Sequence, residues 1–181
     1  MERATTPAAH ATTTAASPAP PAVAPADLGL LLLRLPLGLL MAGHGSQKLF
    51  GLFGGHGLQA TGKGFEALGY RPGALFAGIA GASELLGGLG LALGFLTPLA
   101  AAAVIGVMIN AMVVSASHGL WATEGGLEYP MVIALLALAV ALIGPGALAV
   151  DRFFPWRRGG WRAGALALVL GGVGAAIVLS L

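Results

Sequence analysis

The sequence contains no cysteine and few charged side chains. Only 9% of its 181 residues are Asp, Glu, Lys or Arg, whereas an ordinary soluble domain carries about 25%. Without cysteine the chain cannot itself carry out dithiol chemistry, form disulfides or hold a cysteine-ligated iron–sulfur cluster. A formal net charge of +2 argues against nucleic acid as a partner. The sequence also lacks nucleotide-binding loops and HExxH-type metal motifs, so any redox role requires a separate electron carrier.

Hydrophobic residues make up 57% of the chain, which leaves too little polar surface for a water-facing protein. Five apolar runs approach the roughly 20 residues that a helix needs to cross a bilayer. They are apolar on every face, which favours helices over barrel strands. We therefore expect an all-α integral membrane fold with a four-helix transmembrane bundle and a fifth, C-terminal transmembrane helix, of which the glycine-rich fifth is the weakest candidate. The expected helices cover residues 28–47, 74–96, 97–117, 130–150 and 163–181.

The segments outside these helices differ in composition. Residues 1–26 are rich in Ala, Thr and Pro and predict a disordered tail. The bundle is expected over residues 27–151, a basic linker over 152–162 and the last helix over 163–181. Because positive loop charges favour the cytoplasmic side, we expect the linker and the amino terminus to be cytoplasmic. The cytoplasmic side then carries Arg3, Arg152, Arg157, Arg158 and Arg162, with Trp156 and Trp161 as interfacial anchors, and the outer side carries Lys48, Lys63 and Arg71.

Two charged residues are expected inside the hydrocarbon. Arg34 interrupts the first apolar run and Glu84 the second, and an ionised side chain at that depth costs about 2.5 kcal/mol or more. The two residues differ in depth by about 6 Å, which one arginine side chain can span, so they are our first candidate pair. Two readings stay open. The pair fixes the helix register as a buried salt bridge, or Glu84 relays a proton in a catalytic role while Arg34 holds its charge.

A second polar group is expected near the outer ends of the helices. The stretch MAGHGSQKLFG ends the first apolar run, and its Gly43 and Gly45 would let a neighbouring helix or ligand approach the backbone beside His44. Together with Glu84 below them, these side chains would line a polar wedge that binds a ligand. The alternative is that they are solvated loop ends and that Glu128 stabilises a helix N-terminus. The ligand-binding candidates are His44, Lys48, Asn110, Glu128 and Tyr129, with His118 and Glu124 nearby.

The order of several segments resembles the DoxX family of bacterial membrane proteins. These segments are LLLRLPLGLLMAGHGSQKLFG, FEALGY, GASELLGGLGLALGFLTPLAA and GGLEYPMVIALLALAVALIGPGALAVD, which together lie within residues 28–151. The resemblance implies a four-helix core in the bacterial cytoplasmic membrane and a relation to the DoxD subunit of thiosulfate:quinone oxidoreductase. The residues that match the family pattern are Arg34, His44, Lys48, Glu84, Glu128, Tyr129 and Asp151.

The functional expectation follows from the polar wedge and from this resemblance. We expect an integral membrane subunit of a redox complex that exchanges electrons or protons with the quinone pool, an accessory subunit at most. No covalently bound cofactor and no metal is expected. A quinone is the implied ligand, and His44 and Tyr129 would form hydrogen bonds with its carbonyl group. The alternative is a non-enzymatic assembly factor or a small transporter, which the absence of cysteine, of a nucleotide fold and of haem-type paired histidines favours.

Overall fold

The computed structural model describes residues 23–154 and 159–181, so the predictions for residues 1–22 and for Trp156, Arg157 and Arg158 lie outside the described residues. Every regular element in the described part is a helix, which confirms the all-α class. The α-helices are α1 (Pro25–Phe50), α2 (Gly57–Ala67), α3 (Gly73–Leu93), α4 (Thr97–Ser115), α5 (Glu128–Ile143) and α6 (Trp161–Ser180). Short 3₁₀ turns cover Leu52–Gly54, Ala116–His118, Ala122–Glu124 and Val150–Phe153.

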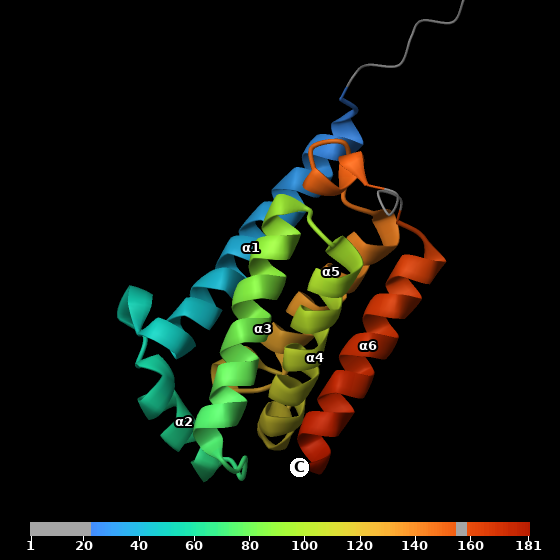
Figure 1. The fold of residues 1–181 in the computed structure, drawn as a ribbon. Coiled ribbons are helices and arrows are strands. Elements are labelled where there is room, and N and C mark those ends of the chain that lie inside the picture. The colour runs from blue at the N-terminus through green and yellow to red at the C-terminus, as the bar shows by residue number, and fades with distance from the viewer. Residues whose placement is uncertain (1–22, 155–158) are drawn as a thin grey trace, which may run out of the picture.

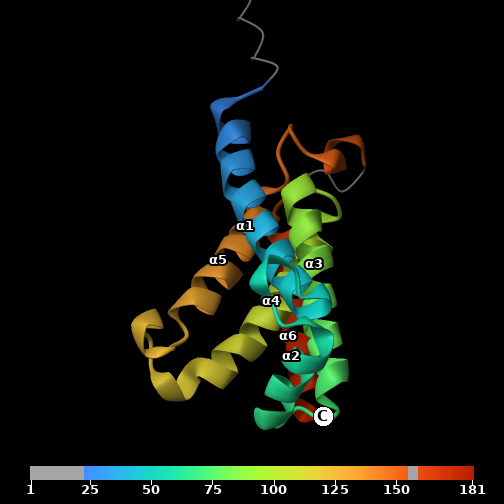
Figure 2. The same cartoon turned by 90° about the vertical axis from the view of Figure 1, so that its left-hand side faces the viewer.

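The long helices form an up-and-down bundle (Figure 1). The N-terminal end of the bundle, where α1 begins, also holds the α3–α4 turn and residues 144–154. The C-terminal end, where α6 stops, holds α2 and residues 116–127. Figure 2 shows α5 inclined away from α1 toward the C-terminal end. Large apolar side chains cover the outside of the bundle, including Leu32 at 74% and Leu86 at 68% exposure, as expected of a surface that faces lipid.

Four helices are long and apolar enough to cross a membrane: α1, α3, α4 with its extension to His118, and α6. The predicted last helix is therefore long enough to span, and the short helix is α5. Its 16 residues end at Ile143, well before the predicted residue 150, and reach only about 24 Å. The sequence GPG ends it, because Gly144 leaves helical geometry with a φ of 102° and Pro145 has no N–H to donate.

Glycines fix how α1 packs against α3. A Cβ atom added at Gly38 would lie 2.4 Å from the Gly88 carbonyl oxygen, and one added at Gly45 would lie 2.5 Å from the Gly81 carbonyl oxygen. The two backbones are therefore in direct contact at two levels, one on each half of the interface. Small residues allow this close approach between membrane helices. The antiparallel register is set by these contacts, and the first turns of α1 extend beyond the end of α3 (Figure 1).

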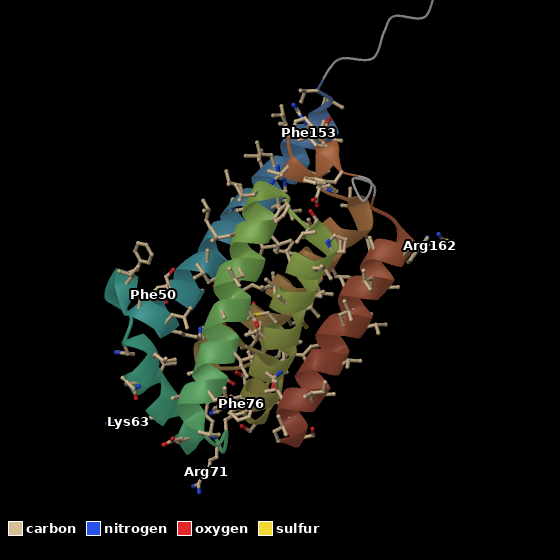
Figure 3. All side chains as sticks on the ribbon, in the orientation of Figure 1. Phe50, Lys63, Arg71, Phe76, Phe153 and Arg162 are labelled. Carbon is tan, nitrogen blue, oxygen red and sulfur yellow. The ribbon has the colours of Figure 1, made fainter. Side chains whose placement is uncertain are left out.

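Helix α2 was not expected from the sequence, because residues 57–67 form no long apolar run. It packs against α3 at the C-terminal end, where a Cβ atom added at Gly62 would meet the Ala74 backbone at 2.8 Å. The charged side chains Lys63 and Arg71 lie at this end, and Arg162 lies at the other (Figure 3). Lys63 and Arg71 thus lie at the opposite end from Arg162, as the loop assignment predicts, while the side of the membrane that each end faces stays a prediction.

Candidate functional site

Glu84 forms an ion pair with Lys48 near the middle of the bundle. The Lys48 ammonium lies 2.6 Å from the Glu84 carboxylate, and the Glu84 side chain is 4% exposed against 25% for Lys48. Lys48 comes from the last turn of α1 and Glu84 from the centre of α3. The glycine contacts between α1 and α3 bring these two levels together. A buried carboxylate in a membrane helix is thereby neutralised.

The predicted pairing of Arg34 with Glu84 is wrong. The Arg34 guanidinium instead donates to the carbonyl groups of Leu91 and Ala92 at the end of α3 and to that of Leu148. A helix C-terminus attracts cations because its last carbonyls are unpaired and carry partial negative charge. The depth estimate assumed that helix ends are level, whereas the first turns of α1 extend beyond α3. This offset moves Arg34 away from Glu84 and toward the end of α3.

Asp151 completes this arrangement at the N-terminal end of the bundle. Its fully buried carboxylate accepts hydrogen bonds from the backbone N–H of Leu96 at 2.8 Å and of Thr97 at 2.9 Å, and from the Thr97 hydroxyl at 2.7 Å. These groups begin α4, so the carboxylate caps that helix. Asp151 also interacts electrostatically with Arg34. The two charges hold the α3–α4 turn between them, which is a structural role.

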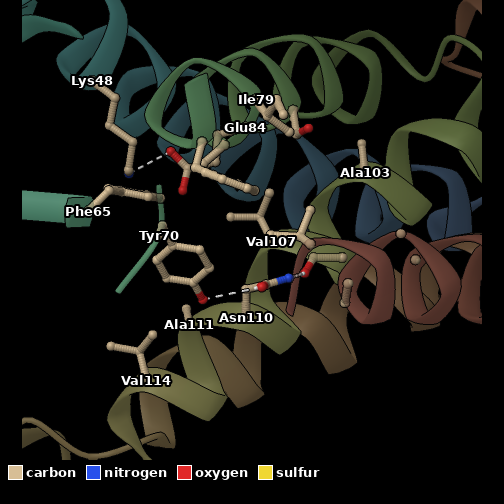
Figure 4. A pocket seen from close by; sticks show the side chains of 18 of the residues that line it. Lys48, Phe65, Tyr70, Ile79, Glu84, Ala103, Val107, Asn110, Ala111 and Val114 are labelled. Atoms are coloured by element: carbon tan, nitrogen blue, oxygen red, sulfur yellow. Dashed lines mark hydrogen bonds and ion pairs between the residues drawn. The ribbon is translucent and has the colours of Figure 1, made fainter. Parts of the chain in front are cut away.

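A pocket of about 420 Å³ lies on the other half of the bundle, among α2, α3, α4 and α6 (Figure 4). Its walls are mainly apolar. Two polar contacts interrupt them: the Lys48–Glu84 ion pair, and the Tyr70 hydroxyl, which donates to the Asn110 side-chain oxygen at 3.3 Å. The Asn110 amide nitrogen donates in turn to the Gly106 carbonyl at 3.0 Å, which fixes the orientation of the amide. Other lining residues include Phe65, Phe76, Ile79, Ser83, Val107, Leu170 and Gly174.

The structure divides the predicted wedge. Lys48, Glu84 and Asn110 line the pocket. His44 and Tyr129 instead contact each other, with the His44 Nε2 atom 3.3 Å from the Tyr129 hydroxyl, and both interact electrostatically with Glu84 from outside the pocket.

Glu128 has a local role. Its carboxylate accepts a hydrogen bond from the Ala122 N–H at 2.9 Å and thereby stabilises the segment before α5. This contact is made to the 3₁₀ turn Ala122–Glu124, while Glu128 itself stands in the first turn of α5, so its stabilisation of that helix start stays a prediction. Glu128 is not among the residues that line the pocket.

Tyr70 and Ser83 line the pocket, and the sequence analysis assigned a role to neither. Tyr70 belongs to the FEALGY segment, directly after α2. A helix over residues 57–67 that packs on the bundle would have placed Tyr70 at the C-terminal end of the bundle. Burial raises the pKa of the Tyr70 hydroxyl, so at neutral pH this group is protonated and able to donate a hydrogen bond.

The pocket combines an apolar interior with hydrogen-bonding groups and no net charge. Lys48 and Glu84 are the charged residues among its lining residues, and they compensate each other. Within the described residues, His, Asp and Glu side chains nowhere gather in a group of three that would hold a metal ion. The arrangement suits an uncharged molecule that is mostly apolar and carries a few hydrogen-bonding atoms.

Comparison with known proteins gives one match. No curated protein and no solved structure matches the sequence. The sequence model of the DoxX family matches residues 29–117. This segment contains the pocket residues Lys48, Tyr70, Glu84 and Asn110 and ends before Glu128. Over residues 29–117 the chain therefore belongs to the DoxX family.

Proposed function

We propose that this DoxX-family membrane protein is a subunit of a membrane redox complex and binds a quinone in the pocket among α2, α3, α4 and α6. The pocket is the observation that supports the proposal. Its volume of about 420 Å³ falls within the range of about 300–1,000 Å³ that is usual for small-molecule sites. A quinone ring is apolar and uncharged and carries two carbonyl acceptors, which matches the chemistry of the lining.

The polar lining residues have different proposed roles in quinone binding. The Lys48 ammonium would donate to a quinone carbonyl. The Tyr70 hydroxyl donates to the Asn110 oxygen in the structure, and it would turn this single proton toward the quinone carbonyl when the ligand binds. The Glu84 carboxylate, bonded to Lys48, is the group that holds or releases a proton beside the ring. A bound quinone supplies two-electron, two-proton chemistry, and a partner protein supplies the electrons. His44 and Tyr129 lie outside the pocket, so they are not part of the proposed quinone site.

The location belongs to the same proposal. A DoxX-type redox subunit would lie in the bacterial cytoplasmic membrane, with the amino terminus in the cytoplasm. The C-terminal end of the bundle, with α2 and Tyr70, would then face the outside. The pocket would be nearer to the outer surface, and a partner would deliver electrons from that side.

Quinone binding to the protein purified in mild detergent tests the proposal. We expect a soluble benzoquinone to bind in a saturable manner, and Tyr70→Phe to weaken binding about tenfold because a hydrogen bond to the ring is lost. Tyr129→Phe makes the same chemical change outside the pocket and is the matched control. Equal effects of the two variants, or no saturable binding by the unaltered protein, would contradict the proposal.

The alternative function has its own outcome. A non-enzymatic assembly factor or small transporter predicts no quinone binding. For an assembly factor, deletion of the gene would lower the membrane level of a partner protein, while quinone reduction by other routes stays normal. Affinity purification in mild detergent, followed by identification of the proteins that accompany the chain, identifies that partner.

A further inference from the structure

The pocket lies between two helices that do not close it. Both α3 and α6 pack along α4, but extensive contacts are absent between the described residues of α3 and α6 themselves. Figure 1 shows α4 between them. The floor of the pocket consists of α4 residues such as Gly106 and Val107, and α3 and α6 form its two sides. One side of the pocket is therefore directed outward, where the bundle faces lipid.

The rim on that side is apolar and open. Ile79 of α3 is 42% exposed and Leu170 of α6 is 44% exposed, although both line the pocket. Gly174, one turn after Leu170, is also exposed and lines the pocket, and a Cβ atom added there would meet no atom within 4 Å. Gly171, three residues before Gly174, differs because a Cβ atom there would lie 2.8 Å from the Ala102 carbonyl oxygen. Gly171 thus holds α6 against α4, while Gly174 leaves an opening.

The polar contacts lie on the opposite side of the pocket, next to α2. There Tyr70 donates to Asn110 and Lys48 pairs with Glu84, and Phe65 and Leu68 also line the pocket. The hydrogen-bonding groups thus lie on the α2 side of the pocket, and an apolar opening leads from them past α6 into the bilayer. A molecule that fits both parts has a compact polar head and a long apolar tail.

We propose that the pocket opens sideways into the bilayer between α3 and α6, and that its ligand is a quinone whose tail leaves through this opening across Gly174. This inference rests on the proposed function, because it extends the same quinone site. The absence of net charge decides against a phospholipid as the occupant: the Lys48 charge is compensated by Glu84, so nothing in the lining matches a phosphate group. The ligand therefore enters from the membrane and not from water.

Two quinones with the same head group test the opening: 2,3-dimethoxy-5-methyl-1,4-benzoquinone, which has no tail, and its decyl derivative. Gly174→Phe should fill the opening and weaken binding of the decyl quinone about tenfold, with less than about a twofold effect on the tailless compound. Gly172→Phe is the matched control: a Cβ atom there also meets nothing within 4 Å, but Gly172 does not line the pocket. It should change neither affinity.

The other outcomes separate the two proposals. If Gly174→Phe weakens both quinones equally, or neither, the sideways opening is wrong and the quinone site remains. If Gly174→Phe removes a co-purified phospholipid and leaves decyl quinone binding unchanged, the opening holds a lipid and the inference is also wrong. If the unaltered protein binds neither quinone, the proposed function fails and the inference fails with it. Thermal unfolding of both glycine variants verifies that each is folded.

Discussion

Lys48 and Glu84 are joined at 2.6 Å, yet their surroundings differ: the Glu84 side chain is 4% exposed and that of Lys48 is 25% exposed. Lys48 stands in the last turn of α1, from which its long side chain can extend to the membrane interface. Glu84 stands at the centre of α3 and has no such freedom. Loss of one partner therefore has unequal consequences for the other.

The first prediction concerns this inequality. Lys48→Met should lower the free energy of unfolding by about 3 to 5 kcal/mol, because it leaves a buried carboxylate without its cation. Glu84→Gln should cost only about 1 kcal/mol, since Lys48 can reach water and the amide keeps the shape of the carboxyl group. Unfolding of each variant in detergent, followed by circular dichroism, measures the difference.

The double variant Lys48→Met with Glu84→Gln is the control. It removes both charges and should be more stable than Lys48→Met alone. Additive losses would show that the ion pair contributes nothing to stability. Quinone binding by Glu84→Gln, measured in the same preparation, shows whether the ion pair affects ligand binding in addition to protein stability.

Much of this fold could be predicted because hydrophobicity alone determines membrane helices. The five apolar runs correspond to α1, α3, α4, α5 and α6, and the family was recognised from the order of its segments. The end of α5 was missed although Gly144 and Pro145 are ordinary helix breakers. The predicted end of this helix followed the apolar run, which continues past Gly144 and Pro145 to Val150.

The pairing of charges could not be predicted in the same way. Arg34 and Glu84 are both buried, but burial does not name a partner. The partner depends on the offset between α1 and α3, which the contacts of Gly38 and Gly45 determine. A sequence with thirty glycines offers many such contacts, and nothing in it selects these. The pocket depends further on α2, whose mixed composition gives no long apolar run.

The second prediction tests the glycine contacts. Gly45→Ala should destabilise the bundle by about 1 to 3 kcal/mol, because the new methyl group collides with the α3 backbone and the helices must separate. Gly43→Ala is the matched control two residues away. A Cβ atom at Gly43 meets nothing within 4 Å, so this variant should be neutral or stabilised by up to about 1 kcal/mol. Thermal unfolding of both proteins tests the prediction, which fails if the two variants unfold alike.

The third prediction separates structure from ligand binding at Arg34. Arg34→Met leaves three carbonyl groups without the cation that bonds to them and should cost about 3 to 5 kcal/mol of stability. Arg34→Lys keeps the charge but has fewer donors, so it should recover only part of the loss. Quinone affinity of the folded fraction should change less than about twofold, because Arg34 is not a pocket residue.

A double variant checks that Arg34 and Glu84 act independently. The effects of Arg34→Met and Glu84→Gln should add, since the two residues belong to separate polar groups. A coupling energy above about 1 kcal/mol would mean that they communicate despite their separation. Denaturant unfolding of the two single variants and the double variant gives this energy directly.

The last prediction concerns the sides of the membrane and uses the absence of cysteine from the chain. A single introduced cysteine is then the only thiol in this chain that can react with a maleimide. Lys63→Cys places it at the C-terminal end of the bundle and Arg162→Cys at the N-terminal end (Figure 3). Because arginines of short loops favour the cytoplasm, a membrane-impermeant maleimide should label Lys63→Cys in intact cells and leave Arg162→Cys unlabelled. Permeabilised cells should give labelling of both, which shows that each thiol is accessible. The reverse pattern in intact cells would place α2 and Tyr70 on the cytoplasmic side, and an electron-donating partner would then have to be sought there.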